Sequence, residues 1–460
     1  MKKKFLKAAS LFLAISSTAC SPFIFNGGSN TNVDTDYELF EGCENSIFFA
    51  LYNYYGYDKQ HFTYKWMGMN DALADHGITV TGWQEEKDAR KFKIKREENC
   101  DLPEDAVIYM VNNQNWDAGI QYNKPITKYK PMSIISTCNG VEFASSPILS
   151  SGISISNATM GGFSANYREA FQKGSLNYLC VKYSAHILPI FAACVNAVEN
   201  KKAIKNADGS ALSLSITNWA IQSLDEYDEM ASVDSIDKDH PTIRKLDYAK
   251  FFDGTYNLTN GDAAKALTEF VSDSSKETIK SLYEKNASNS AEDKNSYGNK
   301  ANKKIKCGII APSSVNDSVK SYIDFIQGYL AEAYDVTILP TGSVTSSDTQ
   351  DKVARTLCNQ GADFIISLQD DTNRNAAAEV CNNNGVYFAI GGSCQNPNDY
   401  DGIKELPYYV GSVGTSIDEE RRAAKEMTEY YLQCMIHRAK GEEDLKKFES
   451  EYKSGKKEEN

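Results

Sequence analysis

The chain has 460 residues, of which 41% are hydrophobic and 24% charged, and its formal net charge at pH 7 is -13. This length and hydrophobic content allow two or three domains with sizeable cores. The acidic balance argues against nucleic acid or an anionic membrane surface as the main partner, and it favours a small molecule or another protein.

The first residues form a targeting segment and not part of the fold. Lys2, Lys3, Lys4 and Lys7 make the N-terminus basic. The apolar stretch from Leu6 to Ile15 that follows is too short to span a bilayer. Small residues then lead to Cys20, an arrangement that resembles a bacterial lipoprotein signal, in which the cysteine receives acyl chains such as palmitate and residues 1–19 are removed. An ordinary secretory signal cleaved near Ala19 is the alternative.

Residues 20–44 are rich in Ser, Asn, Gly and Asp and show no sustained hydrophobic periodicity. This composition is typical of a flexible tether. Acyl chains on Cys20 would hold the body at the extracytoplasmic face of the cell membrane, within the reach of the tether.

Residues 45–202 are predicted to form a first α/β lobe. Apolar runs alternate with helical patterns, and Pro189 is expected to kink the last helix or to mark its true start. Strands are predicted over residues 46–53, 78–84, 105–112, 130–137 and 176–184, with helices over 61–77 and 185–203.

Residues 203–304 break this alternation and are predicted to be an insertion and linker. Residues 210–224 are strand-like, residues 260–285 have a helical pattern, and the segment that follows is polar low-complexity sequence.

Residues 305–436 are predicted to form a second α/β lobe, followed by a charged tail over residues 437–460. Strands alternate with helices in short units, which indicates a parallel sheet with helices on both faces. Ligands of such sheets bind beyond the carboxyl ends of the strands. Strands are predicted over residues 305–312, 334–340, 362–369, 386–392 and 406–413, and helices over 318–333, 348–361, 372–385 and 415–434.

Ten cysteines follow Cys20, without a CxxC pair or the Cys/His spacing of a metal site. Cys194, Cys307 and Cys358 stand where core apolar residues are expected. We interpret most of these cysteines as small buried thiols, which suggests a reducing or anaerobic habitat.

Three segments, taken in this order, resemble a known family: "YDKQHFTYKWMG" (57–68), "YLCVKYSAHILPIFAACVNAV" (178–198) and the run from Thr349 to Gly392. They are similar to type I periplasmic binding proteins, and most of all to the basic membrane protein family of nucleoside-binding lipoproteins that serve ABC transporters. The resemblance implies an α/β fold of two Rossmann-like lobes with a mid-chain insertion. It covers residues 46–200 and 305–436. The sequence departs from the family at Gly391, Gly392 and Ser393, where an acidic residue is usual.

The candidate ligand site needs aromatic faces for stacking and a few polar groups that fix orientation. In the first lobe the candidates follow predicted strands: Tyr55, Tyr57, Asp58, Phe62 and Trp116. A surface turn, with the aromatic rings packed on the first helix or at an edge, is the alternative interpretation.

In the second lobe, Asp370 and Asn373 follow the strand over 362–369, and Gly392 would let a ligand approach the backbone closely. The two polar residues could equally cap the next helix, and the glycine could belong to an ordinary tight turn.

Catalytic signatures are not found in the sequence: there is no GxSxG motif, phosphate-binding loop or HExxH helix, and the five histidines have no metal spacing. We therefore expect a non-enzymatic protein without cofactor or metal. The predicted function is a lipid-anchored solute-binding protein that delivers a small polar ligand, a nucleoside or a sugar, to an ABC permease. A surface adhesin or a ligand sensor is the alternative.

Overall fold

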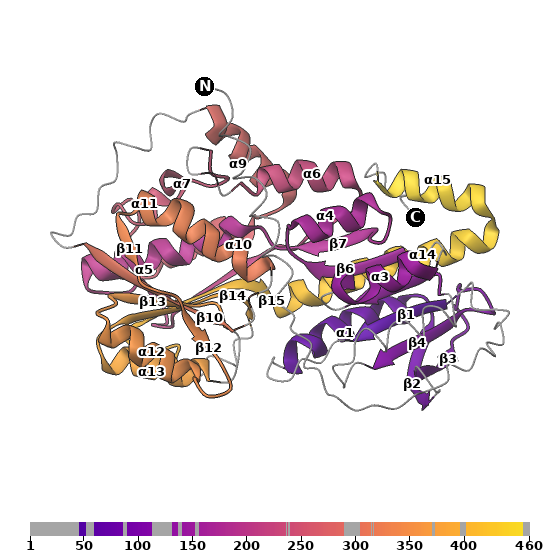
Figure 1. Cartoon of the computed structure of the whole chain (residues 1–460), viewed down its shortest axis with the longest axis horizontal. Helices are drawn as coiled ribbons and strands as arrows, with labels where there is room; N and C mark the ends of the chain where they lie inside the picture. Colours follow the sequence, from indigo (N-terminus) through magenta and orange to yellow (C-terminus); the bar gives the residue numbers. More distant parts are fainter. Residues whose placement is uncertain are drawn as a thin grey trace, which may run out of the picture. The chain divides into compact units, whose positions relative to one another are not determined.

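A computed structural model of the chain describes residues 46–51, 59–85, 90–112, 131–136, 140–151, 156–235, 237, 240–288, 304–313, 315, 317–369, 373–395 and 402–453. Cys20, the predicted tether and the polar segment 289–303 lie outside the described residues. The described part forms two largely parallel sheets with helices packed on them (Figure 1), which confirms the predicted fold class.

The first sheet has eight strands in the order β2-β3-β4-β1-β5-β6-β7-β9. Its central part, β4-β1-β5-β6-β7, is parallel, whereas β2, β3 and β9 pair antiparallel at its edges. The strand bounds are Ser46–Leu51 (β1), Ile78–Glu85 (β2), Arg90–Arg96 (β3), Val107–Asn112 (β4), Ser133–Ser136 (β5), Ser156–Gly161 (β6), Tyr178–Val181 (β7) and Trp219–Ile221 (β9).

The second sheet has seven strands in the order β11-β10-β13-β14-β15-β8, with β12 also paired to β10. Every pairing is parallel. The strand bounds are Leu212–Ile216 (β8), Ile305–Pro312 (β10), Val336–Ile338 (β11), Gly342–Val344 (β12), Phe364–Ser367 (β13), Tyr387–Gln395 (β14) and Tyr409–Ser416 (β15).

The two sheets share one arrangement. If β8 and β12 of the second sheet are left aside, the parallel strands of each sheet, numbered along the chain, run 2-1-3-4-5. This is the order of doubly wound folds in which the strand order reverses between the first and third strands. The reversal falls between β1 and β5 in the first sheet and between β10 and β13 in the second. Both sheets therefore have a point at their carboxyl edge where such folds bind ligands.

The helices of the described part have the following bounds: Lys59–Asp75 (α1), Gly140–Ser151 (α3), Ala165–Gln172 (α4), Leu188–Asn200 (α5), Leu224–Val233 (α6), Lys245–Ala249 (α7), Asp262–Ser272 (α8), Lys276–Ser288 (α9), Asp317–Phe325 (α10), Ala331–Ala333 (α11), Gln350–Asn359 (α12), Arg374–Asn383 (α13), Ile417–Lys440 (α14) and Glu442–Lys453 (α15). A 3₁₀ turn, Ser184–Ile187 (η1), precedes α5, and a π-helical turn, Ile326–Leu330 (η2), joins α10 to α11.

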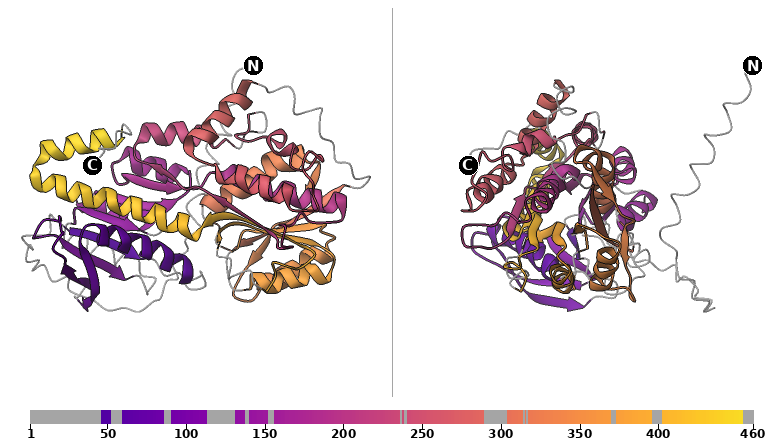
Figure 2. Two further views of the ribbon diagram at one scale, coloured as in Figure 1. Left: turned by 180° about the vertical axis from the view of Figure 1, so that it is seen from behind. Right: turned by 90° about the vertical axis from the view of Figure 1, so that its left-hand side faces the viewer.

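Two helices pack on the sheet that they do not follow. Helix α5 comes directly after β7 of the first sheet, but it packs against β13, β14 and β15 of the second. Helix α14 comes directly after β15 of the second sheet, and it packs along α1 and against β5 and β7 of the first (Figure 2). We use first lobe and second lobe for each sheet together with the helices packed on it. The predicted boundaries at 202 and 436 do not anticipate this exchange.

The α1–α14 contact is close because Gly68 has no side chain: a Cβ placed there would lie 2.0 Å from the carbonyl oxygen of Arg421. Beside it, Arg421 Nη2 donates to Asp71 Oδ1 at 2.7 Å. Backbone contact and ion pair together fix the start of α14 on the first lobe.

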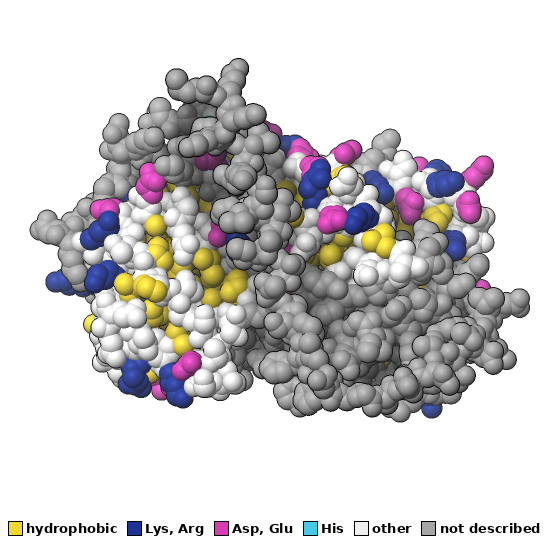
Figure 3. Space-filling view, in the orientation of Figure 1, with side chains coloured by type: hydrophobic (Ala, Val, Ile, Leu, Met, Phe, Trp, Pro, Cys, Tyr) yellow, Lys and Arg dark blue, Asp and Glu magenta, His cyan; other side chains and the backbone are white. Residues whose placement is uncertain are grey.

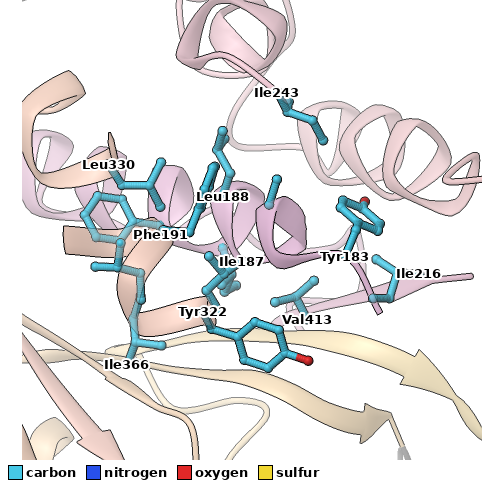
Figure 4. Close-up of a cluster of buried hydrophobic side chains, with 14 of the residues drawn as sticks. Tyr183, Ile187, Leu188, Phe191, Ile216, Ile243, Tyr322, Leu330, Ile366 and Val413 are labelled. Atoms are coloured by element: carbon cyan, nitrogen blue, oxygen red, sulfur yellow. The ribbon is translucent and has the colours of Figure 1, made fainter. Parts of the chain in front are cut away.

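One large apolar cluster runs through both lobes and their connections. It contains residues of β7, η1 and α5 together with residues of β8, β9, α10 and β13–β15. Figure 4 shows part of it, with Phe191, Leu330 and Ile366 in the second lobe and Tyr183 and Ile216 near the connections. A separate cluster lies between the second sheet and helices α12 and α13.

Most predicted elements are found within a few residues of their predicted positions. Pro189 stands in the first turn of α5, so it marks the start of the helix as predicted, and the Ser416 side chain caps α14 by accepting from the Glu419 N–H at 3.0 Å. Gly361 and Gly385, at φ +82° and +67°, follow α12 and α13 at the predicted ends. The predicted charged tail forms α15, whose Leu445, Phe448 and Tyr452 pack on the core beside α14.

Some strands are missing from the prediction. The edge strand β3 is "RKFKIKR", whose apolar residues alternate with lysine and arginine, and β6 is "SNATMG", which has few β-branched residues. Strand β12 is only three residues long. None of the three is a continuous apolar run, which is the pattern that predicts a buried strand.

Residues 203–304 are built into both lobes. Strand β8 pairs with β15 in the second sheet, and β9, two residues later, pairs with β7 in the first. Helix α8 packs on β8. This segment was predicted as an insertion; its described part also supplies one edge strand to each sheet.

The described cysteines are reduced. Cys194 and Cys307 are buried in α5 and β10, as predicted, while Cys358 in α12 is half-buried. On the face shown in Figure 3, positive and negative side chains lie next to each other over the described surface. Arg168 and Asp228 are an exposed ion pair of the described residues. In the described ranges, no helix is long and apolar enough to cross a membrane.

Candidate functional site

The carboxyl ends of the central strands are where the sequence places the ligand site. The segments after β1, β5 and β13 border the two points of strand-order reversal. Tyr55, Tyr57 and Asp58 come after β1, and Asp370 comes after β13; these four residues lie outside the described residues. They come directly after strands of the two sheets in the chain, and both their placement and their role stay predictions.

The other candidates are described to different extents. Trp116 follows β4 and lies outside the described residues, and Phe62 belongs to α1 although its side chain is not described. Asn373 stands at the N-cap position of α13, but its side chain makes no capping hydrogen bond there. Phe62 thus lies in the first turn of the helix that follows β1, and Asn373 directly precedes the helix that follows β13.

Gly392 lies in β14 with φ +78°, at an irregularity in its pairing with β15. A Cβ placed on it would lie 2.8 Å from Cε2 of Tyr322 on α10. The sequence predicts that a ligand approaches the backbone at Gly392, and in this structure the Tyr322 ring lies close to it instead; ligand binding there stays a prediction.

Helix α10 also touches the first lobe. A Cβ placed on Gly162, directly after β6, would lie 2.5 Å from the Ser318 Oγ in the first turn of α10. Farther along the helix, the Tyr322 ring meets His186 edge-on, with centroids 4.6 Å apart. The carboxyl ends of β6 and β14 thus both contact α10, which brings this edge of the two sheets together.

The chain passes between the lobes at three places, which we call the crossing segments. They are residues 182–187 between β7 and α5, residues 217–218 between β8 and β9, and the junction of β15 and α14 at Ser416. Each consists of a few residues, and the three lie next to one another in the fold.

Contacts between the crossing segments involve both rings and backbone groups. Tyr183 stacks on Trp219 with ring centroids 5.1 Å apart and planes 8° apart. The Asn218 N–H donates to Glu419 Oε1 at 2.6 Å, and the Ser416 N–H donates to Ser215 Oγ at 3.1 Å. The three connections therefore form one bonded unit.

A buried carboxylate lies at this unit between two lysines. Glu420, in the first turn of α14, is 3% exposed. Its Oε1 is 3.2 Å from Lys182 Nζ and accepts from the Thr415 hydroxyl, and its Oε2 is 3.6 Å from Lys65 Nζ. Lys65 belongs to α1, directly after the segment that contains Asp58, and Lys182 is the first residue after β7. Two cations and one anion thus meet at the carboxyl edge of the first sheet.

A second buried carboxylate holds the first crossing segment. Asp234 accepts from the Ser184 N–H and from the Ser184 hydroxyl, both at 2.6 Å. Burial raises the pKa of Asp234 to about 6, although hydrogen bonds from Ser184 and Ala185 act in the opposite direction. Asp234 follows α6, so it ties that helix to the start of η1.

His186 is fully buried beside this carboxylate. Its Nδ1 donates to the Tyr183 carbonyl oxygen, while its Nε2 has no hydrogen-bond partner among the described residues. Burial lowers the pKa of His186 to about 3, so the ring is neutral at physiological pH. A neutral, enclosed imidazole has the role of a packing group between η1 and α10.

An open hollow of about 390 Å³ lies beside the second and third crossing segments. It is lined by hydroxyl and charged groups that already pair with one another: Arg422 Nε donates to Glu419 Oε2 at 2.7 Å. In the part of the chain that the structure describes, no group of three or more His, Cys, Asp or Glu side chains could hold a metal ion.

Sequence reasoning missed Lys182, Glu420 and Asp234. Lys182 had a usable signal, because it directly follows a buried strand that was predicted. Glu420 and Asp234 had none: an acidic residue in the first turn of a helix is ordinary, and the partners of both lie far away in the sequence.

Comparison with known proteins gave no matching family model and no matching curated protein. Among solved structures, the chain is similar to a Rhodopseudomonas palustris ABC-transporter solute-binding protein in complex with 4-hydroxybenzoate, with 9% identity, a TM-score of 0.39 and coverage of 88% of this chain and 82% of that one.

It is also similar to an ABC-transporter periplasmic solute-binding protein from Actinobacillus succinogenes with bound D-allose (9% identity, TM-score 0.40, 87% and 93% coverage). The transcription regulator CcpA of Lactococcus lactis is similar as well, with 8% identity, a TM-score of 0.39 and coverage of 85% of this chain and 92% of that one. Such values are too low to carry function from these proteins to this chain.

Proposed function

We propose that the chain is an extracytoplasmic solute-binding protein whose two lobes close on a small polar ligand. The observation that supports this most is the set of three adjacent crossing segments between two sheets, each of which has a core of five parallel strands in the order 2-1-3-4-5. Short connections gathered at one place can act as a hinge, since a few backbone rotations there turn one lobe against the other.

Ligand binding would favour the closed form because only that form offers contacts from both lobes at once. On the first lobe, Tyr55, Tyr57, Phe62 and Trp116 would supply stacking faces, and Asp58 would accept hydrogen bonds from ligand hydroxyls.

On the second lobe, Asp370 and Asn373 would fix the orientation of the ligand, and the backbone near Gly392 would allow close approach. Lys65 and Lys182 stand at the same edge, so they would border the site next to the hinge. A nucleoside or a sugar has the rings and hydroxyl groups that such a set of side chains recognises.

The predicted targeting segment, residues 1–19, suggests that this activity takes place at a membrane. We propose that acylated Cys20 anchors the protein at the extracytoplasmic face and that the closed form delivers its ligand to an ABC permease. The mass of the N-terminal peptide tests the anchor: a diacylated or triacylated cysteine at position 20 is expected, and an unmodified N-terminus near residue 20 would contradict it.

Binding and not catalysis is the activity that the described residues favour. The buried His186 is neutral and faces Tyr322, and Glu420 is held between lysines, so neither is arranged as a base next to a nucleophile. The adhesin alternative relied on residues 203–304 as a separate module, and the pairing of β8 and β9 with the two sheets weakens that reason.

Calorimetry on the full chain in mild detergent tests the site. For whichever nucleoside or monosaccharide binds, Asp58→Ala and Phe62→Ala should each weaken affinity about tenfold or more, equivalent to about 1.4 kcal/mol. Lys447→Ala, on α15, is the control and should bind like the unaltered chain. Unchanged affinity in both site variants would remove these residues from the site.

A further inference from the structure

Helices α12 and α13 lie side by side on one face of the second sheet (Figure 1). Each precedes a strand of the parallel pair β13–β14, so the two helices run parallel to each other. They also have the same length, ten residues each, which brings their last turns to the same level.

A cysteine occupies the last turn of each helix. Cys381 is buried in the core beneath α12 and α13, and Cys358 is half-buried and packs against the same core. Their side chains lie within reach of a thiol–thiol hydrogen bond, which shifts the pKa of both groups.

Both cysteines are held in place by matching helix ends. The Cys358 carbonyl oxygen accepts from the Gly361 N–H at 2.9 Å, and the Cys381 carbonyl oxygen accepts from the Val386 N–H at 3.0 Å. A disulfide needs Cα atoms about 4.4–6.8 Å apart and side chains that point toward each other. Cys358 and Cys381 stand in the last turns of two neighbouring helices and pack in one core, which is the placement that such a bond requires.

The two thiols differ in reactivity. The hydrogen bond with Cys381 and the nearby Arg355 guanidinium lower the pKa of Cys358, whereas the same hydrogen bond and burial raise the pKa of Cys381. The thiolate is the nucleophile in thiol–disulfide exchange. The half-buried cysteine is therefore also the one that reacts first.

We propose that Cys358 and Cys381 are a redox-active dithiol that oxidises to a disulfide joining α12 to α13. With a small-molecule disulfide such as oxidised glutathione, the Cys358 thiolate attacks one sulfur and releases one glutathione thiolate. Cys381 then loses its proton and attacks the Cys358 sulfur, which releases the second glutathione. Two protein thiols are oxidised, and one glutathione disulfide is reduced to two thiols.

Four other described cysteines are poor candidates for this chemistry. Burial raises the pKa of Cys180, Cys194, Cys307 and Cys434, which keeps those thiols protonated. Cys100 is half-buried, and its Sγ accepts from Arg96 Nη1 at 3.4 Å. The proposal thus separates one reactive pair from the four buried thiols, to which the interpretation as small buried thiols continues to apply.

The full chain is incubated with oxidised glutathione, alkylated, digested with trypsin and examined by mass spectrometry. The expected product is a cross-link between the peptides 356–374 and 375–404. Because the second peptide also contains Cys394, fragmentation must assign the bond to Cys381, and Cys394→Ser must leave the cross-link in place.

Cys358→Ser and Cys381→Ser should each abolish the cross-link, whereas Cys194→Ser should not. Oxidation should raise the melting temperature of the unaltered chain by roughly 5–10 °C and leave both single variants unchanged. A stable mixed disulfide of Cys358 with glutathione, a cross-link to Cys394, or no reaction of either thiol would each overturn the proposal.

Discussion

Replacement of Glu420 by alanine is expected to lower the free energy of unfolding by about 3–5 kcal/mol, the usual cost of removing one partner from a buried ion pair. The carboxylate is 3% exposed and lies within 3.2 Å of Lys182 Nζ and 3.6 Å of Lys65 Nζ. Without it, two largely buried ammonium groups keep their desolvation cost and lose this counter-charge. Urea denaturation of the full chain measures the effect.

Two matched variants separate this effect from a general effect of altering α14. Glu426→Ala removes an acidic residue from the same helix, and because its side chain is 36% exposed it should cost no more than about 1 kcal/mol. Adding Lys182→Met to Glu420→Ala should recover part of the loss, since one uncompensated cation disappears. Equal destabilisation by the alanine variants at 420 and 426 would show that Glu420 does not hold the crossing segments.

Asp234 is expected to make stability depend on pH in the direction opposite to that of a typical carboxylate. Burial raises its pKa to about 6, above the ordinary value of 3.8. A folded state with the higher pKa binds the proton more tightly, so this contribution to stability is complete below about pH 3.8 and is lost as the pH rises through 6. Two pKa units correspond to about 3 kcal/mol.

The Asp234→Asn variant cannot titrate at this position. Between pH 4 and pH 6.5 the free energy of unfolding of the unaltered chain should therefore fall by about 3 kcal/mol relative to that of the variant. Denaturation at several pH values measures the difference between the two proteins, in which other titrating groups cancel.

Asp228→Asn is the opposite-sign control. The Arg168 guanidinium lowers the pKa of Asp228. As the pH rises from acid values, the free energy of unfolding of this variant should therefore fall relative to that of the unaltered chain. A pH-independent difference for Asp234→Asn would mean that its carboxyl group is not held in the buried setting described.

Most strands and helices between residues 305 and 436 could be predicted from sequence, because the strands are continuous apolar runs buried on both faces. Ile366 lies in such a run, and the helix that follows it ends just before the signal Gly385. These signals are local, so a single sequence carries them.

The features that could not be predicted from the sequence are contacts between segments far apart in the chain. Nothing near Leu188 indicates that α5 packs on β13, β14 and β15, which begin more than a hundred residues later. Nothing near Leu212 indicates that β8 and β9 join different sheets. The same holds for the partners of Glu420. These features follow from the packing of the whole chain, and they are the features that make up the proposed hinge.

The candidate ligand residues show a different limit. They were chosen because they follow strands in the chain, and at Gly392 the structure places the Tyr322 ring where a ligand was predicted to approach. Whether Tyr55, Asp58, Trp116 and Asp370 point toward a common ligand depends on segments outside the described residues, so their roles stay predictions.

Small-angle X-ray scattering of the full chain in detergent-matched buffer, titrated with nucleosides and monosaccharides, tests the central claim most directly. If the two lobes close about the crossing segments, one class of solute should reduce the radius of gyration and saturate at one ligand per chain. Asp58→Ala should need a higher concentration for the same change. Saturable binding with an unchanged scattering curve, or no binding by any member of either class, would contradict the account.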